Sequence, residues 1–269
     1  MTLWRTIAGF FLAMAIASAA RSARALSGSG AAAATLVGTL AIAAGFQWGG
    51  LLIAYFVVST LLTKWRAHEK ERRTLPVVAK GGARDAMQVL ANGGVFAVAA
   101  AAMILDPSTS PSPSHPDQWI ALGAGALAVS ASDTFATEIG TLVGGAPRSV
   151  LTWKRVPTGA SGGVTVAGTL AAIIGAALVG AFVLLLGWSR HTGIAIAMGG
   201  LVGSTLDSVF GATIQSRRWC VQCSAVTERT VHVCGVRTER SGGIPFLDND
   251  GVNLLSSVIG GLLAMALAA

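Results

Sequence analysis

Long apolar stretches alternate with short polar segments along the whole chain. Eight of them have helical length, at residues 3–20, 31–46, 48–63, 86–105, 119–144, 161–187, 191–214 and 250–268. A helix needs about 20 apolar residues to cross the hydrocarbon core of a bilayer, so most of them predict membrane spans. The stretches at 31–46 and 48–63 are short, which fits two tilted or broken helices or one re-entrant hairpin. The pattern predicts an all-α, polytopic transmembrane helical bundle of about eight spans.

Composition supports a membrane protein. Of the 269 residues, 53% are hydrophobic and only 12% are charged, and the mean hydropathy is +0.66. These values exclude a water-soluble domain of this size. The 34 glycines, together with abundant alanine, favour helices that pack closely through small residues. We therefore treat residues 1–269 as one transmembrane domain.

The basic residues predict the orientation in the membrane. If the spans alternate, all of the 19 Lys and Arg residues except Arg5 and Arg190 lie on one side. The positive-inside rule makes that side cytoplasmic and places both termini outside. The basic run 64–84 is then an amphipathic surface segment, with contact between nucleotide phosphate and Arg72, Arg73 and Lys80 as the alternative. The loop 106–118, which lacks Lys and Arg, is an external linker. The net charge of +7 reflects topology and attraction for anionic lipid or phosphate, and we expect no nucleic-acid partner.

The first 25 residues resemble a signal peptide, with an Arg, an apolar run and small residues, but we interpret them as an anchor. The lack of a transit-like leader favours a prokaryotic plasma membrane.

Short motifs recur in the same order in the two halves of the chain. They are Gly-Thr-Leu-Ala at 38–41 and 168–171, Gly-Gly-Leu at 49–51 and 199–201, and Asn-X-Gly-Val at 92–95 and 249–252. Four spans separate the members of each pair, which favours two parallel three-helix repeats. Chance likeness between Gly- and Ala-rich helices is the alternative.

Three carboxylates, Asp133, Asp207 and Asp250, fall near the predicted cytoplasmic ends of three different spans. An isolated ionised acid at such depth costs several kcal/mol, and a bound hard cation would offset that cost. Mg²⁺ prefers a few carboxylates together with water and substrate phosphates. We therefore expect these three acids to bind magnesium. Glu138, on the same span as Asp133, is a candidate to orient the metal or to accept a proton.

A basic, glycine-rich segment precedes the stretch 161–187. Lys154 and Arg155 stand beside a turn formed by Thr158, Ser161, Gly162 and Gly163. Backbone amides at the start of a helix, with cations nearby, suit phosphate, although a Lys-Arg pair beside a membrane helix is often only a topology anchor. Other polar residues at the same entrance complete the expected substrate- and phosphate-binding set: Arg84, Gln88, Asn92, Ser204, Gln215, Asn249 and Asn253.

The loop 216–248 carries a second possible metal site. Cys220-x-x-Cys223 is followed by His232-x-Cys234, and three thiols with one imidazole can hold zinc tetrahedrally. The predicted cytoplasmic location keeps thiols reduced and disfavours a structural disulfide. Ordinary or redox-active thiols remain the alternative. A zinc ion here would fold a small lid over the entrance.

Four motifs resemble the integral-membrane family that includes plant phytyl-phosphate kinase: SDTFATEIG, KRVPTGASGGVTVAGT, GSTLDSVFGATIQ and LDNDGVNLLSS. The resemblance extends from about Leu26 to the C-terminus. It implies transfer of a phosphoryl group from a nucleoside triphosphate to a prenyl monophosphate, giving the diphosphate, in the isoprenoid salvage that feeds tocopherol biosynthesis. In this reaction Asp133, Glu138, Lys154 and Arg155 are the expected catalytic residues. The chain length of the prenyl group and the formation of a homodimer stay open.

The family is also distantly similar to dolichol kinases and to CTP-dependent phosphatidate cytidylyltransferases. That similarity favours CTP as the donor and makes cytidylyl transfer to a lipid phosphate one alternative. A cation-coupled transporter is another, because it also needs acids within the membrane. A transport path would carry polar residues through to the outer side, whereas here they stop in the inner half, which favours an enzyme at the cytoplasmic interface.

Overall fold

The computed structural model describes residues 3–106 and 116–269 and consists mainly of long helices. The helices are α1 (Leu3–Ser22), α2 (Gly28–Ala44), α3 (Phe46–Lys64), α4 (Ala67–Thr74), α5 (Ala86–Leu105), α6 (Pro116–Val143), α7 (Val166–Leu185), α8 (Arg190–Thr213) and α9 (Asn249–Ala268). The strands are β1 (Arg148–Ser149), β2 (Gly163–Val164), β3 (Arg217–Cys220), β4 (Ala225–Thr227) and β5 (Glu239–Gly242). Most of the expected external linker at 106–118 lies outside the described residues.

Seven of the described helices, all those above except α2 and α4, are long and apolar enough to cross a membrane. α2 is equally apolar but has 17 residues. Each predicted span corresponds to one helix, so the expected helical bundle is confirmed. Gly45 alone joins α2 to α3, and α3 has 19 residues, enough for a span of its own. The two short apolar stretches are therefore two helices connected by a tight turn.

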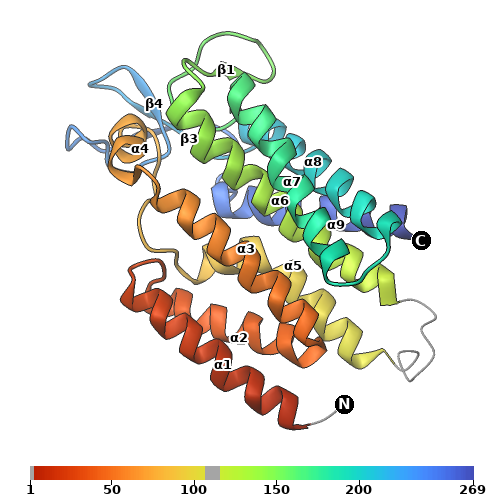
Figure 1. Cartoon of the computed structure of the whole chain (residues 1–269). Coiled ribbons are helices and arrows are strands. Elements are labelled where there is room, and N and C mark those ends of the chain that lie inside the picture. The colour runs from red at the N-terminus through yellow and green to blue at the C-terminus, as the bar shows by residue number, and fades with distance from the viewer. Residues whose placement is uncertain (1–2, 107–115) are drawn as a thin grey trace.

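The two ends of the bundle differ in what they carry. In Figure 1 the start of α1 lies at the bottom and the end of α9 at the right, whereas α4, β1, β3 and β4 lie at the opposite end of the bundle, toward the top and left. The connections at the upper left hold most of the basic residues. This arrangement agrees with the predicted topology, in which both termini lie on the side opposite to the basic loops.

Helix α6 occupies the centre of the bundle. Of its apolar window 67% is buried, compared with 22% for α1 and at most 44% for the other spanning helices. Glycines bring α8 and α9 close to it: a Cβ on Gly203 would lie 2.3 Å from Val129 Cγ2, and a Cβ on Gly125 would lie 2.6 Å from Ala264 Cβ. α8 and α9 approach each other in the same way, because a Cβ on Gly260 would lie 2.6 Å from the carbonyl oxygen of Gly199. These helices pack backbone against backbone.

The short helix α4 lies across the end of α6. Arg73 Nη1 donates hydrogen bonds to the carbonyl oxygens of Thr141 and Leu142, at 2.7 and 2.8 Å. These carbonyls belong to the last turn of α6 and have no partner within their own helix. A cation from α4 thus caps α6 and fixes the connection between α3 and α5 on the basic side.

Three local features differ from the sequence-based expectation. Helix α7 begins at Val166, capped by Thr165, so the turn at 161–163 lies before the helix. The loop 216–248 contains a three-stranded antiparallel sheet in the order β4-β3-β5. The paired motifs of the expected repeat occupy unequal positions, since Gly38 lies in the second half of α2 and Gly168 in the first turn of α7. The repeat stays a prediction.

Candidate functional site

Asp133 on α6 and Asp207 on α8 form an acid pair inside the bundle. Their carboxylates lie close enough for the two charges to interact. Asp207 is 9% exposed, and its Oδ2 has no hydrogen-bond partner among the described residues. No Lys, Arg or His side chain in the described part of the chain forms an ion pair with either carboxylate. Two acids at this depth, without a basic partner, are both ionised only where a cation from elsewhere offsets their charge.

Helix α9 adds hydroxyl groups next to the acid pair. Ser256 lies beside Asp207, and the Oγ atoms of Ser256 and Ser257 are buried and lack partners within residues 3–106 and 116–269. Carboxylate and hydroxyl oxygens suit a hard cation that keeps part of its water shell. The residues present therefore fit magnesium, with the acid pair as its protein ligands.

Asp250 lies apart from the acid pair and binds a lysine. Lys80 Nζ lies 2.5 Å from Asp250 Oδ2 and 3.2 Å from Asp85 Oδ2. Ser256 is six residues further along α9 than Asp250, or about 9 Å along the helix axis. Within the described residues, the three predicted acid ligands do not form one cluster with oxygens within ligand distance of each other. The hydrogen bond with Asp250 raises the pKa of Lys80 above its ordinary 10.5, so the ammonium stays charged.

Glu138 has a basic partner on another helix. Its carboxylate pairs with Lys70 of α4, and Lys70 Nζ also donates to the carbonyl oxygens of Leu62 and Thr63, both at 2.8 Å. The Lys70 ammonium thus binds two free carbonyl groups at the end of α3 and the Glu138 carboxylate of α6 at the same time. In this arrangement Glu138 holds α4 against α6.

The basic pair Lys154 and Arg155 lies on an exposed hairpin. β1 pairs with β2, and Figure 1 shows the connection at β1 projecting beyond the ends of α6 and α7. Both side chains are exposed and form no salt bridge with the described residues. The structure therefore does not bring them to the acid pair, and they stay available to an anion that approaches from solvent.

Ser161 belongs to a second polar cluster, the Glu228 junction, which consists of Ser161, Gln215 and Glu228. Gln215 Nε2 donates to Ser161 Oγ and to Glu228 Oε1, both at 2.8 Å, and Ser161 Oγ donates to the same carboxylate. Gly162 packs here against the end of α8, where a Cβ would lie 2.4 Å from Ala212 Cβ. Burial raises the pKa of Glu228 above its ordinary 4.5, and the hydrogen bonds from Ser161 and Gln215 oppose that shift.

An apolar pocket of about 90 Å³ opens between α1, α2, α3 and α5. Its lining follows α2 from Ala34 to Ile42, and so runs along the bundle rather than across it. Three predicted substrate-binding residues, Arg84, Gln88 and Asn92, meet at one part of this lining. The pocket is apolar along the helices and polar where α5 begins.

The polar part of the pocket is joined to α6 one turn before Asp133. Tyr55 lines the pocket, is 9% exposed, and its phenol interacts with Ser130, Arg84 and Asp133. Ser130 Oγ also donates to the carbonyl oxygen of Asn92 at 3.1 Å, which ties α6 to α5 at this level. Tyr55 and Ser130 thus connect the pocket to Asp133.

The remaining predicted residues take individual positions. Ser204 is buried on the same helix as Asp207, one turn earlier. Asn253 and Thr158 are half-buried, and Asn249 is exposed at the start of α9. Gly163 is in β2, paired with Ser149.

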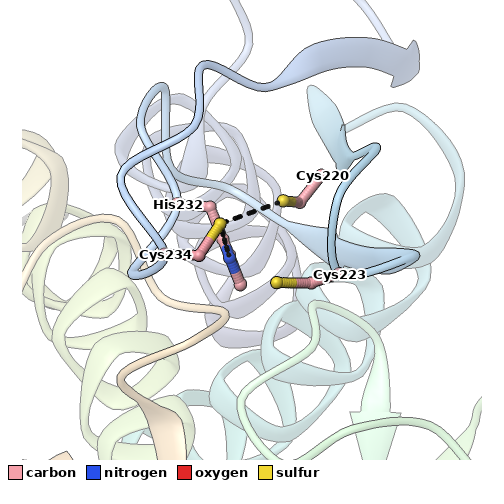
Figure 2. Close-up of side chains that lie close together, drawn as sticks. All are labelled: Cys220, Cys223, His232 and Cys234. Carbon is pink, nitrogen blue, oxygen red and sulfur yellow. Dashed lines mark hydrogen bonds between the residues drawn. The ribbon is translucent and has the colours of Figure 1, made fainter.

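Cys220, Cys223, His232 and Cys234 come together in the sheet of the 216–248 loop, and their ligand atoms all lie within 4.8 Å of one another. Cys220 Sγ is 3.6 Å from Cys234 Sγ, which is 3.3 Å from His232 Nδ1. Figure 2 shows the three sulfur atoms and the imidazole directed toward a common centre. The hydrogen bond with His232 lowers the pKa of Cys234 to about 6.

Sequence reasoning missed Tyr55 and Glu228, treated Lys70 as a surface residue, and named Lys80 only as an alternative phosphate contact. One signal was present, because Tyr55 is the only tyrosine of the chain and stands inside an apolar span. Glu228 is one of three acids in the loop 216–248, which also holds five arginines, so composition does not single it out. The contacts of Lys70 and Lys80 depend on how α4 and the following loop fold back, and no short motif encodes that path.

Comparison with known proteins places these residues in a wider group. The family model described as integral membrane protein DUF92 matches residues 11–261, which include all four motifs quoted above. Protein PGR of Arabidopsis thaliana is 32% identical over 274 residues, which cover 95% of this chain and 93% of that protein. An uncharacterized membrane protein of Methanocaldococcus jannaschii is 26% identical over 98% of this chain and 94% of its own.

A third relative is Protein VTE6, chloroplastic, of Arabidopsis thaliana. It is 28% identical over 244 residues, which cover 89% of this chain and 64% of that protein. No solved structure matches the chain.

Proposed function

We propose that this chain, which belongs to the integral membrane protein family DUF92, is a membrane-bound prenyl-phosphate kinase. The activity is transfer of a phosphoryl group from CTP or another nucleoside triphosphate to a prenyl monophosphate, giving the diphosphate. The relative VTE6 and the resemblance of four motifs to the family of plant phytyl-phosphate kinase support this assignment. Asp133, Asp207 and Asp250 lie in the halves of α6, α8 and α9 that adjoin the basic connections, as a reaction with a cytoplasmic nucleotide requires.

The observation that carries the proposal is the junction of the apolar pocket with the acid pair. A prenyl phosphate has a hydrocarbon tail and one strongly anionic end. The pocket offers apolar walls along α2 and a cation with two amides, Arg84, Gln88 and Asn92, at its polar part. Asp133 adjoins that part through Tyr55. One molecule can therefore place the part of its tail nearest the phosphate in the pocket and present the phosphate toward Asp133.

In this proposal the acid pair holds Mg²⁺, which would shield the charges of the two phosphate-bearing substrates from each other. Phosphoryl transfer needs positioning and charge neutralisation more than covalent help from the protein. Arg84 binds the acceptor phosphate, and Tyr55 and Ser130 shape the site around it. Lys80 forms ion pairs with Asp85 and with Asp250 at the start of α9. In this proposal Lys80 binds the nucleotide phosphates together with the exposed Lys154 and Arg155.

The test uses purified protein in detergent with phytyl or geranylgeranyl phosphate, MgCl₂ and CTP or ATP labelled at the γ-phosphate. Transfer of the label into prenyl diphosphate supports the kinase. A second reaction uses CTP labelled at the α-phosphate and detects the alternative activity. Cytidylyl transfer moves the α-phosphate to the lipid and would label it in this reaction, but not in the reaction with γ-labelled CTP. Absence of turnover with every prenyl phosphate and phospholipid substrate would contradict an enzymatic role.

A further inference from the structure

We propose that Cys220, Cys223, His232 and Cys234 bind one structural zinc ion, and that this metal holds the Glu228 junction in place. Three sulfur atoms and one imidazole nitrogen lie within 4.8 Å of one another. Tetrahedral zinc with bonds of about 2.3 Å to sulfur requires sulfur atoms about 3.8 Å apart. The 3.6 Å between Cys220 Sγ and Cys234 Sγ is close to that spacing.

The local backbone supports a metal site. Cys220 ends β3 and Cys223 follows in the turn to β4, whereas His232 and Cys234 lie in the connection from β4 to β5. Gly235, with φ of 87°, turns the chain directly after Cys234, and its amide donates to the carbonyl oxygen of His232 at 2.9 Å. Two turns from different parts of the sheet thus contribute two ligands each, as in small zinc-binding domains.

The size of the sheet explains why a metal is needed. Its strands have four, three and four residues, and the cluster includes the fully buried Cys220. Such a small unit cannot bury enough apolar surface to fold by itself, and a bound metal supplies folding free energy. A disulfide would use two of the thiols and leave the third with the imidazole, whereas one zinc ion uses all four groups. His232 Nε2 has no hydrogen-bond partner in the described part of the chain, so no competing protein contact fixes the ring.

The segment between the two pairs of ligands contacts the loop that precedes Lys80 and the end of α8. Thr227 Oγ1 donates to the carbonyl oxygen of Pro76 at 2.9 Å, and the Glu228 amide donates to that of Val77 at 2.8 Å. The Glu228 carboxylate accepts hydrogen bonds from Gln215 and Ser161. The zinc-bound sheet therefore fastens the loop that leads to Lys80 onto the end of α8. Loss of the metal should release this loop, whatever reaction the acid pair supports.

The first experiment measures metal content of the full-length protein, purified in detergent under reducing conditions. We expect about one zinc ion per chain by mass spectrometry of metals, and at least about a tenfold fall in Cys223→Ser and His232→Ala. His68→Ala, which changes an exposed histidine of α4, is the matched control and should keep its zinc. A parallel preparation without reductant is analysed by intact mass for any disulfide.

The second experiment follows hydrogen exchange of residues 75–80 and 224–236 before and after a zinc chelator. Faster exchange in both segments supports the proposal, and unchanged exchange at 75–80 would show that the metal does not hold the junction. Where a variant fails to fold, Co²⁺ binding by the wild-type chain replaces it, with thiolate-to-metal absorption as the signal. A chain that binds neither zinc nor Co²⁺, or that carries a Cys220–Cys234 disulfide, overturns the metal site.

Discussion

The helices of the first and second halves of the chain differ in the space between them. α6, α8 and α9 form a tight group that meets at glycines, with neighbouring backbones so close that a single added Cβ has no room at Gly203 or Gly260. α1, α2, α3 and α5 also approach one another at glycines, since a Cβ on Gly38 would lie 2.8 Å from Ala13 Cβ, but they enclose a pocket, where a Cβ on Gly93 would stand 3.6 Å from Val37. The acid pair belongs to the tight group and the pocket to the other. Closely packed helices fix the position of charge, while a pocket between helices can accept part of a flexible hydrocarbon chain.

The largest effect should follow removal of a charge from the tight group. Asp133→Asn or Asp207→Asn should lower kinase activity by about 10²–10³-fold, because the metal loses a charged ligand and phosphate repulsion is no longer balanced. Activity is measured with prenyl phosphate and labelled nucleotide at saturating Mg²⁺. Asp117→Asn is the control, since Asp117 lies on the same helix but accepts a hydrogen bond from Thr192 at the other end. Wild-type rates in Asp133→Asn would refute the acid pair as the site.

The next effect concerns the packing itself. Gly260→Ala should destabilise the protein by about 1–3 kcal/mol, because the new methyl group meets Val129 Cγ2 at 2.3 Å and the carbonyl oxygen of Gly199 at 2.6 Å. The control Gly94→Ala adds the same methyl group on α5, where its nearest neighbour is Leu90 Cβ at 3.9 Å. Thermal unfolding in detergent compares the two variants. Equal transition temperatures would show that the close contact at Gly260 tolerates an added methyl group as well as the open position at Gly94 does.

A smaller effect should follow filling of the pocket. Gly93→Leu is expected to raise KM for phytyl phosphate by about tenfold, while stability changes little, because the side chain enters space that the tail needs. Gly94→Leu places the same side chain one position away, outside the pocket lining. Kinetics with short and long prenyl phosphates separate a loss of tail binding from general damage. If both variants behave alike, the pocket does not hold the tail.

The smallest effect lies at the junction that joins the two halves. Burial raises the pKa of Glu228 above 4.5, so the folded state binds the proton more tightly than the unfolded state. This contribution to stability is complete below pH 4.5 and is lost as the pH rises through the raised pKa. Glu228→Gln should remove this pH dependence. The measurement is the transition temperature of wild type and variant across a pH series that begins below 4.5, and parallel curves would contradict the assignment.

Sequence periodicity was sufficient for the helices of this chain, since each apolar stretch became one helix and the motif-based family is confirmed by the match over residues 11–261. The length of an apolar stretch and the position of basic residues are local properties of the sequence. In a membrane the first determines which segments form spanning helices and the second determines their orientation. The short spacing within Cys220-x-x-Cys223 and within His232-x-Cys234 also predicted that these four side chains could share one site. In the structure their ligand atoms do lie close together.

Long-range pairing could not be read from the sequence. Nothing in the sequence separated Asp250 from Asp133 and Asp207. In the structure the loop before α5 places Lys80 beside Asp250. Helix α4 likewise places Lys70 beside Glu138. The glycine-rich turn at 161–163 looked like a phosphate cradle at a helix start, and in the structure Thr165 caps that helix instead. For the two acids a partner distant in sequence decided which group stayed free, whereas at the turn the neighbouring Thr165 took the capping position.

The weak burial of α1 has a consequence for how substrate arrives. Only 22% of its apolar window is covered, and it forms one wall of the pocket through Ala13, Ile16 and Ala17. A wall that is bordered by lipid on its other side permits sideways entry from the membrane leaflet. Under the proposed function, the tail then never crosses water, and turnover should follow the mole fraction of prenyl phosphate in the bilayer. Diluting that lipid with inert phospholipid at fixed total substrate should slow the reaction, as expected for kinetics in two dimensions.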